Sequence, residues 1–379
     1  MNFPAEEILE KLKQKERATL DRNLHTVPYL SVNGKYEDLS GERIGWWTNG
    51  FWGGILWQMY HLTGETRFKD AAEELENKMD AALFDSRVMD HDSGFRFLLT
   101  AVADYRLTKN PASLNRGILA ADNLTGRFNL NGSFIRAWND DNTVNRAGWA
   151  IIDCMMNLPL LYWASEITKD PRYRTIAMKH ADMAMDKFIR SDGSANHILV
   201  FDPETGICEK ALGGQGYCEG SSWTRGQAWA LYGFTLSYLH TGEARYFNTA
   251  KRIAAYFISR IPKSGLIPVD FDQPSDVSFE DSTAAAIASC GLIELAKICR
   301  GTAHNDGNDD SGAVYMDAAV RILLALHEMR ADYDPMRDGI LSHCSAAYHV
   351  PDHNQYFVYA DYYYIEAVMK LTGDELFLW

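Results

Sequence analysis

Hydrophobic residues recur every three or four positions along almost the whole chain, the spacing of an amphipathic helix. The strict alternation of apolar and polar residues that is typical of strands is rare. The pattern therefore predicts an all-α protein. The predicted helices span residues 5–22, 48–62, 65–84, 94–107, 111–127, 149–167, 170–190, 222–240, 243–260, 280–298, 311–329 and 360–371.

A short pattern repeats where one predicted helix stops and the next begins: an aromatic residue or Leu, then Thr, then Gly, Asn or Asp. Copies stand at 60–65, 105–110, 164–170, 238–243 and 369–374, with a disrupted copy near 298–302. Thr or Asp is the expected N-cap of the second helix. The repeat thus marks the tight turn of a helical hairpin.

The helices form six hairpins when 5–22 is paired with 360–371. Hairpins that cannot bury their apolar faces alone must stack on one another. Closing six of them on themselves predicts an (α/α)6 toroid, a six-hairpin barrel of alternating inner and outer helices. Residues 301–310 resemble a polar surface loop, and no linker-like segment divides the chain, so we expect residues 1–379 to form one domain.

Long segments connect successive hairpins, whereas the turns within a hairpin are short. The long segments span 23–47, 85–93, 128–148, 191–221, 261–279 and 330–359. Each leads into the first helix of the next hairpin. Because long loops in compact domains usually carry function, we expect these loops to gather functional side chains at one mouth of the ring.

The formal net charge is −14, which argues against nonspecific binding to nucleic acid or to an anionic membrane. The first residues lack the basic and apolar segments of a signal peptide, and no apolar stretch is judged to reach the ~20 residues that span a bilayer. Six scattered cysteines without a C-x-x-C pair indicate reduced thiols. These features predict a cytoplasmic protein with no membrane or nucleic-acid partner.

The junctions between long loops and helices are rich in Trp, Asn, Gln and Arg, together with two carboxylates. This combination suits a sugar, because aromatic faces take the apolar face of the ring and polar side chains take its hydroxyl and carboxylate groups. Arg225, in the first turn of an inner helix, would assist the helix dipole in holding an anion. The candidate binding residues are Trp46, His91, Trp138, His197, Gln215, Arg225 and Trp229.

Asp153 is the strongest catalytic candidate, because it lies in an apolar stretch over 149–159 that is expected to be helical. Burial, and a second carboxylate such as Asp92 nearby, would raise its pKa and produce a general acid at neutral pH. Asp92 and Asp281 could instead be ordinary N-caps, the tryptophans core residues and the histidines surface or satisfied core residues. His343, His349 and His353 share one loop that we expect to be solvated; no metal site is predicted.

Seven motifs resemble the unsaturated glucuronyl hydrolases of glycoside hydrolase family 88 over essentially the full length. They are W-T-N-G-F-W at 47–52, H-D-S-G-F at 91–95, R-A-W-N at 136–139, I-I-D-x-M-x-N-L at 151–158, G-S-S-W-T-R-G-Q-A-W at 220–229, E-D-S-T-A-A-A at 280–286 and A-D-Y-Y-Y-I-E-A at 360–367. The resemblance implies the same toroid, with Asp153 as general acid/base, Asp92 as the second essential carboxylate and the seven binding candidates in contact with the sugar.

The resemblance further implies an oligosaccharide substrate with a 4,5-unsaturated uronic acid at its non-reducing end, hydration of its vinyl ether, and no cofactor. The expected assembly is a monomer or weak homo-oligomer. Family members that favour sulfated substrates carry Ser and Lys residues in the last loop, whereas residues 343–353 here contain no Lys. We therefore hypothesise a preference for unsulfated disaccharides.

Three other functions are considered. The related unsaturated rhamnogalacturonyl hydrolases usually have Gly-Asn-Gly where this chain has Gly226-Gln-Ala, which favours the glucuronyl interpretation. Sugar epimerases on the same toroid use a pair of histidines for proton transfer. The pair of Asp92 and Asp153 argues against this alternative. In a non-catalytic glycan-binding protein a buried Asp153 would have no role, which argues against this alternative.

Overall fold

The computed structural model describes residues 3–141, 143–306 and 311–379. Helices dominate, which confirms the prediction of a mainly helical protein. One set of helices lies toward the centre of the molecule: α2 (Asn49–Thr63), α4 (Ser93–Phe97), the π-helix η1 (Leu98–Val102), α5 (Ala103–Thr108), α7 (Leu158–Thr168), α9 (Thr224–Thr241), α11 (Ser282–Asp306) and α13 (Val358–Thr372). A second set surrounds it: α1 (Ala5–Arg22), α3 (Thr66–Leu83), α6 (Pro111–Gly126), α8 (Pro171–Lys187), α10 (Ala244–Arg260) and α12 (Ser311–Met329).

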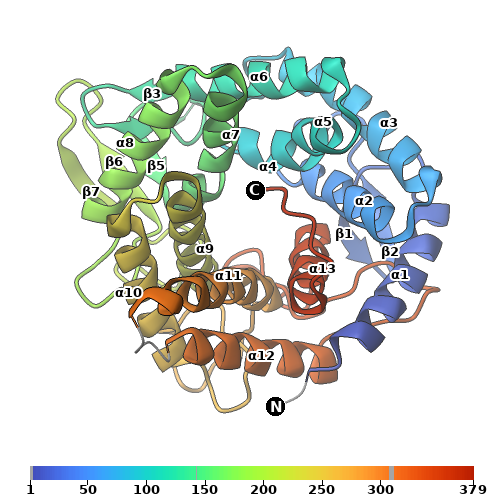
Figure 1. Cartoon of the computed structure of the whole chain (residues 1–379). Helices are drawn as coiled ribbons and strands as arrows, with labels where there is room; N and C mark the ends of the chain where they lie inside the picture. Colours follow the sequence, from blue (N-terminus) through green and yellow to red (C-terminus); the bar gives the residue numbers. More distant parts are fainter. Residues whose placement is uncertain (1–2, 142, 307–310) are drawn as a thin grey trace.

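The helices are arranged in a ring (Figure 1). Each central helix packs against its outer partner, and α13 packs against α1. The central helices also pack against one another in order, from α2 through η1, α4, α7, α9 and α11 to α13, which in turn contacts α2. The contacts therefore close into a circuit around the middle of the molecule.

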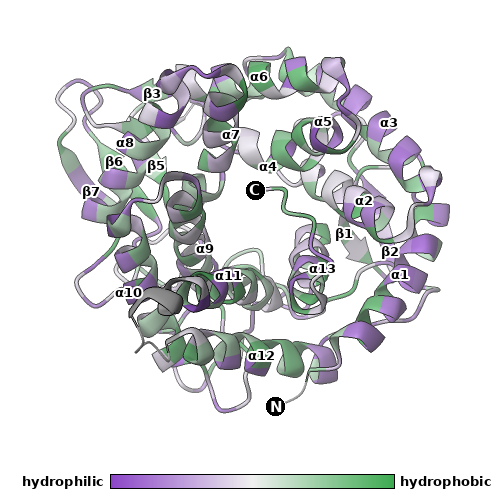
Figure 2. Ribbon diagram, in the orientation of Figure 1, coloured by the Kyte–Doolittle hydropathy of each residue, from purple (hydrophilic) through white to green (hydrophobic). Residues whose placement is uncertain are grey.

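Hydropathy follows this arrangement (Figure 2). Outer helices bury one side only, as α10 does with Tyr246, Ile253 and Phe257, whereas α9 is buried from Thr224 to Ser237. The stretch Ser282–Gly301 of α11 is long and apolar enough to cross a membrane by length and composition, contrary to the sequence-based expectation. It is 94% buried inside the protein, packed against α9, α12 and α13, so core packing accounts for its composition.

The predicted N-cap of the repeated turn is confirmed for Asp170, whose side chain accepts from the N–H of Arg172 (2.8 Å), but it is wrong for Thr. Thr63 does not cap the following helix; its hydroxyl donates to the carbonyl of Met59 (2.7 Å) and accepts from the N–H of Glu65 (3.2 Å). Thr108, Thr168 and Thr241 make the equivalent pair of bonds. The next residue takes the left-handed conformation that ends a helix, as Gly64 does at φ 69°. The Thr side chain therefore closes one helix and orients the start of the next.

Small antiparallel sheets interrupt the helical pattern. Their strands are β1 (Pro28–Val32) with β2 (Lys35–Asp38), β3 (Phe128–Asn129) with β4 (Phe134–Ile135), and β5 (Trp149–Ile151), β6 (Ile198–Phe201) and β7 (Cys208–Leu212) in that order. The predicted helix over 149–167 is thus wrong in its first part: β5 is followed by a 3-10 helix, η2 (Ile152–Met156), and only then by α7. The predicted loop over 301–310 is helical to Asp306, and residues 307–310 lie outside the described residues.

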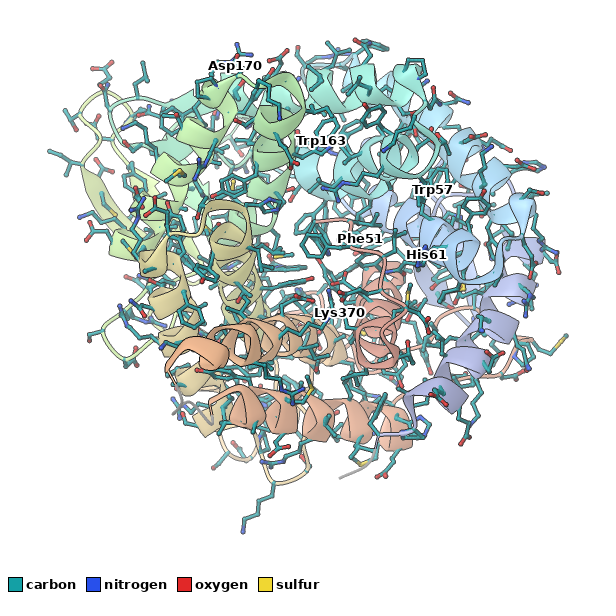
Figure 3. The ribbon with its side chains drawn as sticks, in the orientation of Figure 1. Phe51, Trp57, His61, Trp163, Asp170 and Lys370 are labelled. Carbon is teal, nitrogen blue, oxygen red and sulfur yellow. The ribbon has the colours of Figure 1, made fainter. Side chains whose placement is uncertain are left out.

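The segment after α13 turns back into the centre of the ring (Figures 1 and 3). Trp379 is 1% exposed; it stacks on Tyr363 of α13 and donates its indole N–H to Glu366 (2.8 Å). Its ring also meets Phe95 of α4 edge-on, at 6.2 Å between centroids. Lys370, directed inward in Figure 3, pairs with the buried Glu294 at 2.7 Å. The interior of the ring is therefore filled by aromatic and paired charged side chains.

Candidate active site

A cavity of about 420 Å³ lies where the long loops lead into the central helices. It is lined by Tyr29, Gly45, Trp46, Trp47, Asp90, Asp92, Trp138, Gln215, Arg225, Ala346, Ala347 and Tyr359. These residues come from separate junctions along the chain, before α2, α4, β5, α9 and α13. The prediction that the long connections gather polar and aromatic side chains in one place is confirmed.

Asp92 stands at the N-cap position of α4, but within the described part of the chain its side chain does not cap that helix. Its Oδ1 lies 3.2 Å from Nε2 of His91. The other ring nitrogen of His91, Nδ1, lies 2.9 Å from the carbonyl oxygen of Ala137 and must carry a hydrogen to donate to it. Nε2 of a neutral His91 therefore carries a lone pair beside the Asp92 carboxyl group.

Burial lowers the pKa of His91 and raises the pKa of Asp92 well above its ordinary value, which agrees with a neutral imidazole beside a protonated carboxyl group. The nearby Asp90 raises the pKa of Asp92 further, while Arg96 lowers it. Asp92 is thus held in an environment that disfavours its charged form.

The pairing of β5 with β6 brings Asp153 to His197. Ile151 pairs with Ile198, and the N–H of Ile152 donates to the carbonyl of His197 (3.1 Å). Oδ1 of Asp153 consequently lies 3.8 Å from Nε2 of His197, too far for a direct hydrogen bond. Both atoms are buried and lack a hydrogen-bond partner among the described residues. The pair therefore offers a free acceptor and a free ring nitrogen to a bound molecule.

The backbone around His197 fixes which of its nitrogens carries the hydrogen. The N–H of Gln215 donates to Nδ1 (3.0 Å), which must be an acceptor, although the carbonyl of Gly213 is also 3.2 Å from it. The hydrogen is then on Nε2, the atom that faces Asp153. Burial lowers the pKa of His197 to about 3, so this imidazole remains neutral.

Burial raises the pKa of Asp153 to about 7. His91 and Arg225 oppose the shift, and Asp92 adds to it, because two neighbouring carboxylates disfavour each other's ionisation. A carboxyl group with a pKa near neutrality is partly protonated at pH 7 and can both give and take a proton. The sequence predicted this property for Asp153. It placed the residue in an α-helix, however, whereas the structure places it in the 3-10 helix η2.

Arg225 is 2% exposed and holds one wall of the cavity. Its guanidinium donates to Asp281 (2.9 Å), to the carbonyl of Ser345 (2.7 Å) and to that of Ala346 (2.6 Å). The side-chain amide of Gln215 donates to the same carbonyl of Ala346 (2.7 Å). Asp281 also caps α11 by accepting from the N–H of Thr283 (3.1 Å), so the N-cap interpretation is correct for Asp281 but incomplete.

The structure places the predicted site residues in two layers. Asp92, Trp46, Trp138, Gln215 and Arg225 line the cavity. His91 and His197 contact lining residues, and Asp153 lies within the electrostatic reach of Asp92 and Arg225. Trp229 does not line the cavity: it is 1% exposed and packs against Phe95, with 5.1 Å between ring centroids. Its predicted contact with a sugar would have to be indirect in this conformation.

Seven lining residues were not among the predicted site residues: Tyr29, Gly45, Trp47, Asp90, Ala346, Ala347 and Tyr359. Tyr29 comes from β1, a strand that the hydrophobic pattern did not reveal. Trp47 and Tyr359 stand at predicted junctions but resemble core aromatics, and their rings are 4.8 Å apart. Asp90 forms an ion pair with the buried Arg96 and accepts from the N–H of Asp92 (3.0 Å). The D-x-D spacing over residues 90–92 was the signal that could have identified it.

Asp90, His91 and Asp92 have potential metal-ligand atoms within 4.8 Å of one another. The hydrogen bonds and ion pairs above already explain this cluster, so we assign it no metal. The three histidines of the last loop do not converge: the ring of His353 stacks on Phe279, and His349 Nε2 lies 2.8 Å from the carbonyl of Tyr217. The expectation of a plain solvated loop is wrong for His353, which is half-buried against that ring.

Comparison with known proteins agrees with this geometry. Residues 19–304 match the sequence profile of Glycosyl Hydrolase Family 88. The unsaturated glucuronyl hydrolase of Bacillus sp. (strain GL1) is 38% identical over 341 residues, 88% of each chain. That Bacillus enzyme is responsible for the degradation of glycosaminoglycan. Its crystal structure superposes with a TM-score of 0.89 at 34% identity, covering 97% of this chain and 96% of that one.

Two streptococcal relatives extend the comparison. The unsaturated chondroitin disaccharide hydrolase of Streptococcus pyogenes serotype M1 is 35% identical, covering 86% of this chain and 82% of the relative. A variant of the unsaturated glucuronyl hydrolase from Streptococcus agalactiae, solved in complex with dGlcA-GalNAc6S, superposes with a TM-score of 0.82 at 28% identity, covering 99% of this chain and 93% of that one.

Proposed function

The chain belongs to glycosyl hydrolase family 88, and from this premise we propose that it removes a 4,5-unsaturated glucuronic acid from the non-reducing end of lyase-generated oligosaccharides. The observation that carries the proposal is the pair of carboxyl groups, buried Asp92 and half-buried Asp153, with the pKa of Asp153 raised to about 7 beside an aromatic cavity. The names of the relatives, which act on unsaturated glucuronyl and chondroitin disaccharide substrates, support it.

The proposed reaction is the hydration of a vinyl ether. Asp153 gives its proton to carbon 4 of the double bond, and positive charge develops at carbon 5 and the ring oxygen. Water adds to carbon 5 and loses a proton to the Asp153 carboxylate, which regenerates the acid. The resulting hemiketal opens to a ketone at carbon 5, and carbon 1 then releases the second sugar as an alcohol. The net consumption is one water, and the rule that relates carboxylate spacing to anomeric configuration does not apply.

The remaining site residues bind and orient the sugar in this proposal. Trp46 and Trp138 offer ring faces, and Arg225 is the one cation among the described lining residues, suited to the uronate carboxylate. The free ring nitrogen of His197 and the carboxyl group of Asp92 are available to the water or to sugar hydroxyl groups. His91 and Gln215 hold these groups in place.

We also propose that the ring is a single-domain (α/α)6 toroid, as the circuit of contacts from α2 to α13 supports. The six cysteines, all in the described ranges, form no disulfide, which supports a reducing cytoplasmic location. The proposed assembly is a monomer or weak homo-oligomer without a nucleic-acid or membrane partner. Sedimentation of the purified protein over a range of concentrations tests the assembly.

The first test is the ultraviolet absorbance of the unsaturated uronate on mixing the enzyme with unsaturated chondroitin disaccharide. The double bond is consumed, so the band is expected to disappear. If it disappears only with an unsaturated rhamnogalacturonan disaccharide, the related rhamnogalacturonyl activity is the correct one. If neither substrate loses the band, the proposed function is wrong; a change of configuration detected by NMR without loss of the band would indicate an epimerase.

The alkaline side of the pH profile is expected to report the pKa of Asp153. A general acid must be protonated, and the raised pKa of about 7 keeps Asp153 protonated up to that pH. We expect kcat/KM to fall about tenfold per pH unit above pH ~7, instead of above the ~4 of an ordinary aspartate. Initial rates across this range check it. A profile that stays flat well above the pKa would contradict the assignment of Asp153 as the acid.

Unsulfated disaccharides are expected to be turned over faster than their 6-sulfated forms. The loop 343–353 offers Ala346 and Ala347 to the cavity, and Arg225, the one cation among the described lining residues, is assigned to the uronate carboxylate. A sulfate group bound there would therefore lose its hydration without pairing with a positively charged side chain. We expect kcat/KM to favour the unsulfated chondroitin disaccharide by about tenfold or more, a difference of about 1.4 kcal/mol. Equal or faster turnover of the 6-sulfated form would refute this.

A further inference from the structure

The two elements that carry the catalytic carboxyl groups meet at Gly94 and Asn157. Gly94 follows Asp92 in α4, and Asn157 follows Asp153 at the end of η2. A Cβ atom on Gly94 would lie 2.5 Å from Cα and 2.8 Å from the carbonyl oxygen of Asn157, closer than packed atoms approach. Only glycine allows this approach, so the distance between α4 and η2 is set by direct contact at these residues.

The side chain of Asn157 joins both carboxyl-bearing segments. It is fully buried, and its Oδ1 accepts from the N–H of Phe95 (2.8 Å). Its Nδ2 approaches the carbonyl oxygen of Asp153 at 3.4 Å, and the amide also hydrogen-bonds the Asp92 carboxyl group. The amide of Asn157 thus contacts both segments, α4 through its oxygen and η2 through its nitrogen.

Asn157 stands at the N-cap position of α7, where an asparagine side chain usually accepts from the first turn of its own helix. Its side chain makes no such bond within the described structure. The Asn157 side chain therefore does not cap α7, the role that its position favours, and hydrogen-bonds to α4 instead. This choice of partners distinguishes it from an ordinary helix cap.

We propose that Asn157 is a positioning residue that fixes the Asp92 carboxyl group relative to Asp153. The inference rests on the proposed function, since it assigns Asn157 a role in the same reaction. Asn157 acts through its hydrogen bonds to the two segments and does not line the cavity itself. Gly94 makes the arrangement possible by leaving room for the Asn157 backbone.

The hydrogen bond from Asn157 favours the charged form of Asp92. Asp92 holds its proton in the wild-type enzyme, so loss of this donor leaves the charge beside Asp153 unchanged. A carboxylate at position 157 would instead add a like charge and raise the pKa of Asp153. The charged and titratable groups that face the pair from all packed elements are Asp90, His91, Arg96, Arg127, Cys154, His197 and Arg225.

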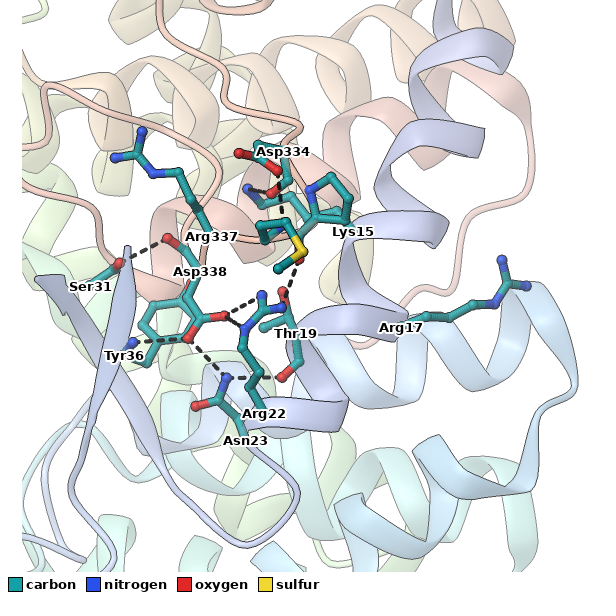
Figure 4. Close-up of polar contacts among 12 residues, drawn as sticks. Lys15, Arg17, Thr19, Arg22, Asn23, Ser31, Tyr36, Asp334, Arg337 and Asp338 are labelled. Atoms are coloured by element: carbon teal, nitrogen blue, oxygen red, sulfur yellow. Dashed lines mark hydrogen bonds and ion pairs between the residues drawn. The ribbon is translucent and has the colours of Figure 1, made fainter. Parts of the chain in front are cut away.

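Asn23 offers a matched control at a remote place (Figure 4). It is 4% exposed, and its Nδ2 donates to the carbonyl of Thr19 (2.9 Å) and to the carboxylate of Asp338 (3.1 Å). Its Oδ1 accepts from the hydroxyl of Thr26 (3.1 Å). Asn23 thus repeats the bonds of Asn157, a carbonyl and a carboxyl acceptor with one donor, without touching the cavity.

The test compares Asn157→Ala, Asn157→Asp and Asn23→Ala with the wild-type enzyme on the unsaturated chondroitin disaccharide. We expect kcat of Asn157→Ala to fall about 10- to 100-fold with KM within about threefold, because misplaced catalytic groups cost the chemical step. The alkaline limb of kcat/KM should stay in place in Asn157→Ala and move to higher pH in Asn157→Asp. Asn23→Ala should lose stability only, with kcat and the limb unchanged.

Wild-type kcat in both variants at position 157, measured per folded molecule, together with an unshifted limb in Asn157→Asp, would overturn the proposal and leave Asn157 a structural residue. If Asn157→Ala does not fold, the isosteric Asn157→Asp still tests the proposal through the direction in which its alkaline limb of kcat/KM moves. Failure of the proposed function is a different result: the wild-type enzyme itself would then leave the absorbance of the disaccharide unchanged.

Discussion

Replacing Asp153 by Asn is expected to lower kcat by about 10³-fold while the enzyme still binds its substrate. An amide has no proton to give to carbon 4 and cannot accept one from water, so both halves of the proposed hydration are lost. Asn keeps the size and one acceptor oxygen of Asp, and the neutral side chain suits a buried place beside His197. The loss should therefore appear in kcat with KM little changed.

Absorbance of the unsaturated disaccharide measures the rate, and tryptophan fluorescence measures binding, because Trp46, Trp47 and Trp138 line the cavity. Asp361→Asn is the matched control: this aspartate is also buried, with its pKa raised to about 6 by burial, but it bonds Tyr36 and the backbone of residues 340–341 outside the cavity. It should keep kcat within about threefold. Comparable losses in the two variants would show that Asp153 matters for folding rather than for proton transfer.

The sequence was sufficient for the features that depend on helical periodicity. Helix positions, hairpin pairs and the meeting of loop residues at one cavity all follow from which positions are apolar and from where turns stand. The Thr turns also have a local cause, although the hydroxyl of Thr63 ends one helix instead of starting the next. Such features need only residues that are close in the sequence or that repeat regularly along it.

The features that the sequence did not reveal depend on contacts between distant segments. The stretch 149–156 has apolar residues that suit a helix, yet pairing of Ile151 with Ile198 draws its beginning into a sheet. That pairing, which no local pattern encodes, is what places Asp153 opposite His197. Likewise Trp229 belongs to a motif of the site, but the aromatic packing around Phe95 separates it from the cavity.

The pair of Arg225 and Asp281 leads to the second large effect. Both side chains are nearly inaccessible, at 2% and 0% exposure, and burial raises the pKa of Asp281 although Arg225 opposes the shift. Burial would lower the pKa of Arg225, but the attraction of Asp281 and other nearby groups exceeds this effect, so the pKa of Arg225 is raised as well. Removing one charge leaves the other buried without this compensation.

Asp281→Asn is therefore expected to lower the free energy of unfolding by about 3–5 kcal/mol, although Asn can still cap α11 at Thr283. Urea unfolding measures it through the midpoint and slope of the transition. Asp272→Asn breaks the exposed pair with Arg260, at 2.7 Å and 39–43% exposure, and should cost less than about 1 kcal/mol. Equal losses in the two variants would contradict the argument from burial.

The same substitution should also raise KM by about tenfold in the fraction that remains folded. Arg225 bonds Asp281 and the carbonyl groups of Ser345 and Ala346 at once, so an unpaired guanidinium is free to leave the position from which it would meet the uronate. Substrate added to the unfolding experiment should then stabilise Asp281→Asn less than the wild-type enzyme at the same concentration. Equal stabilisation of both would show that Asp281 supports the fold without fixing Arg225 for the substrate.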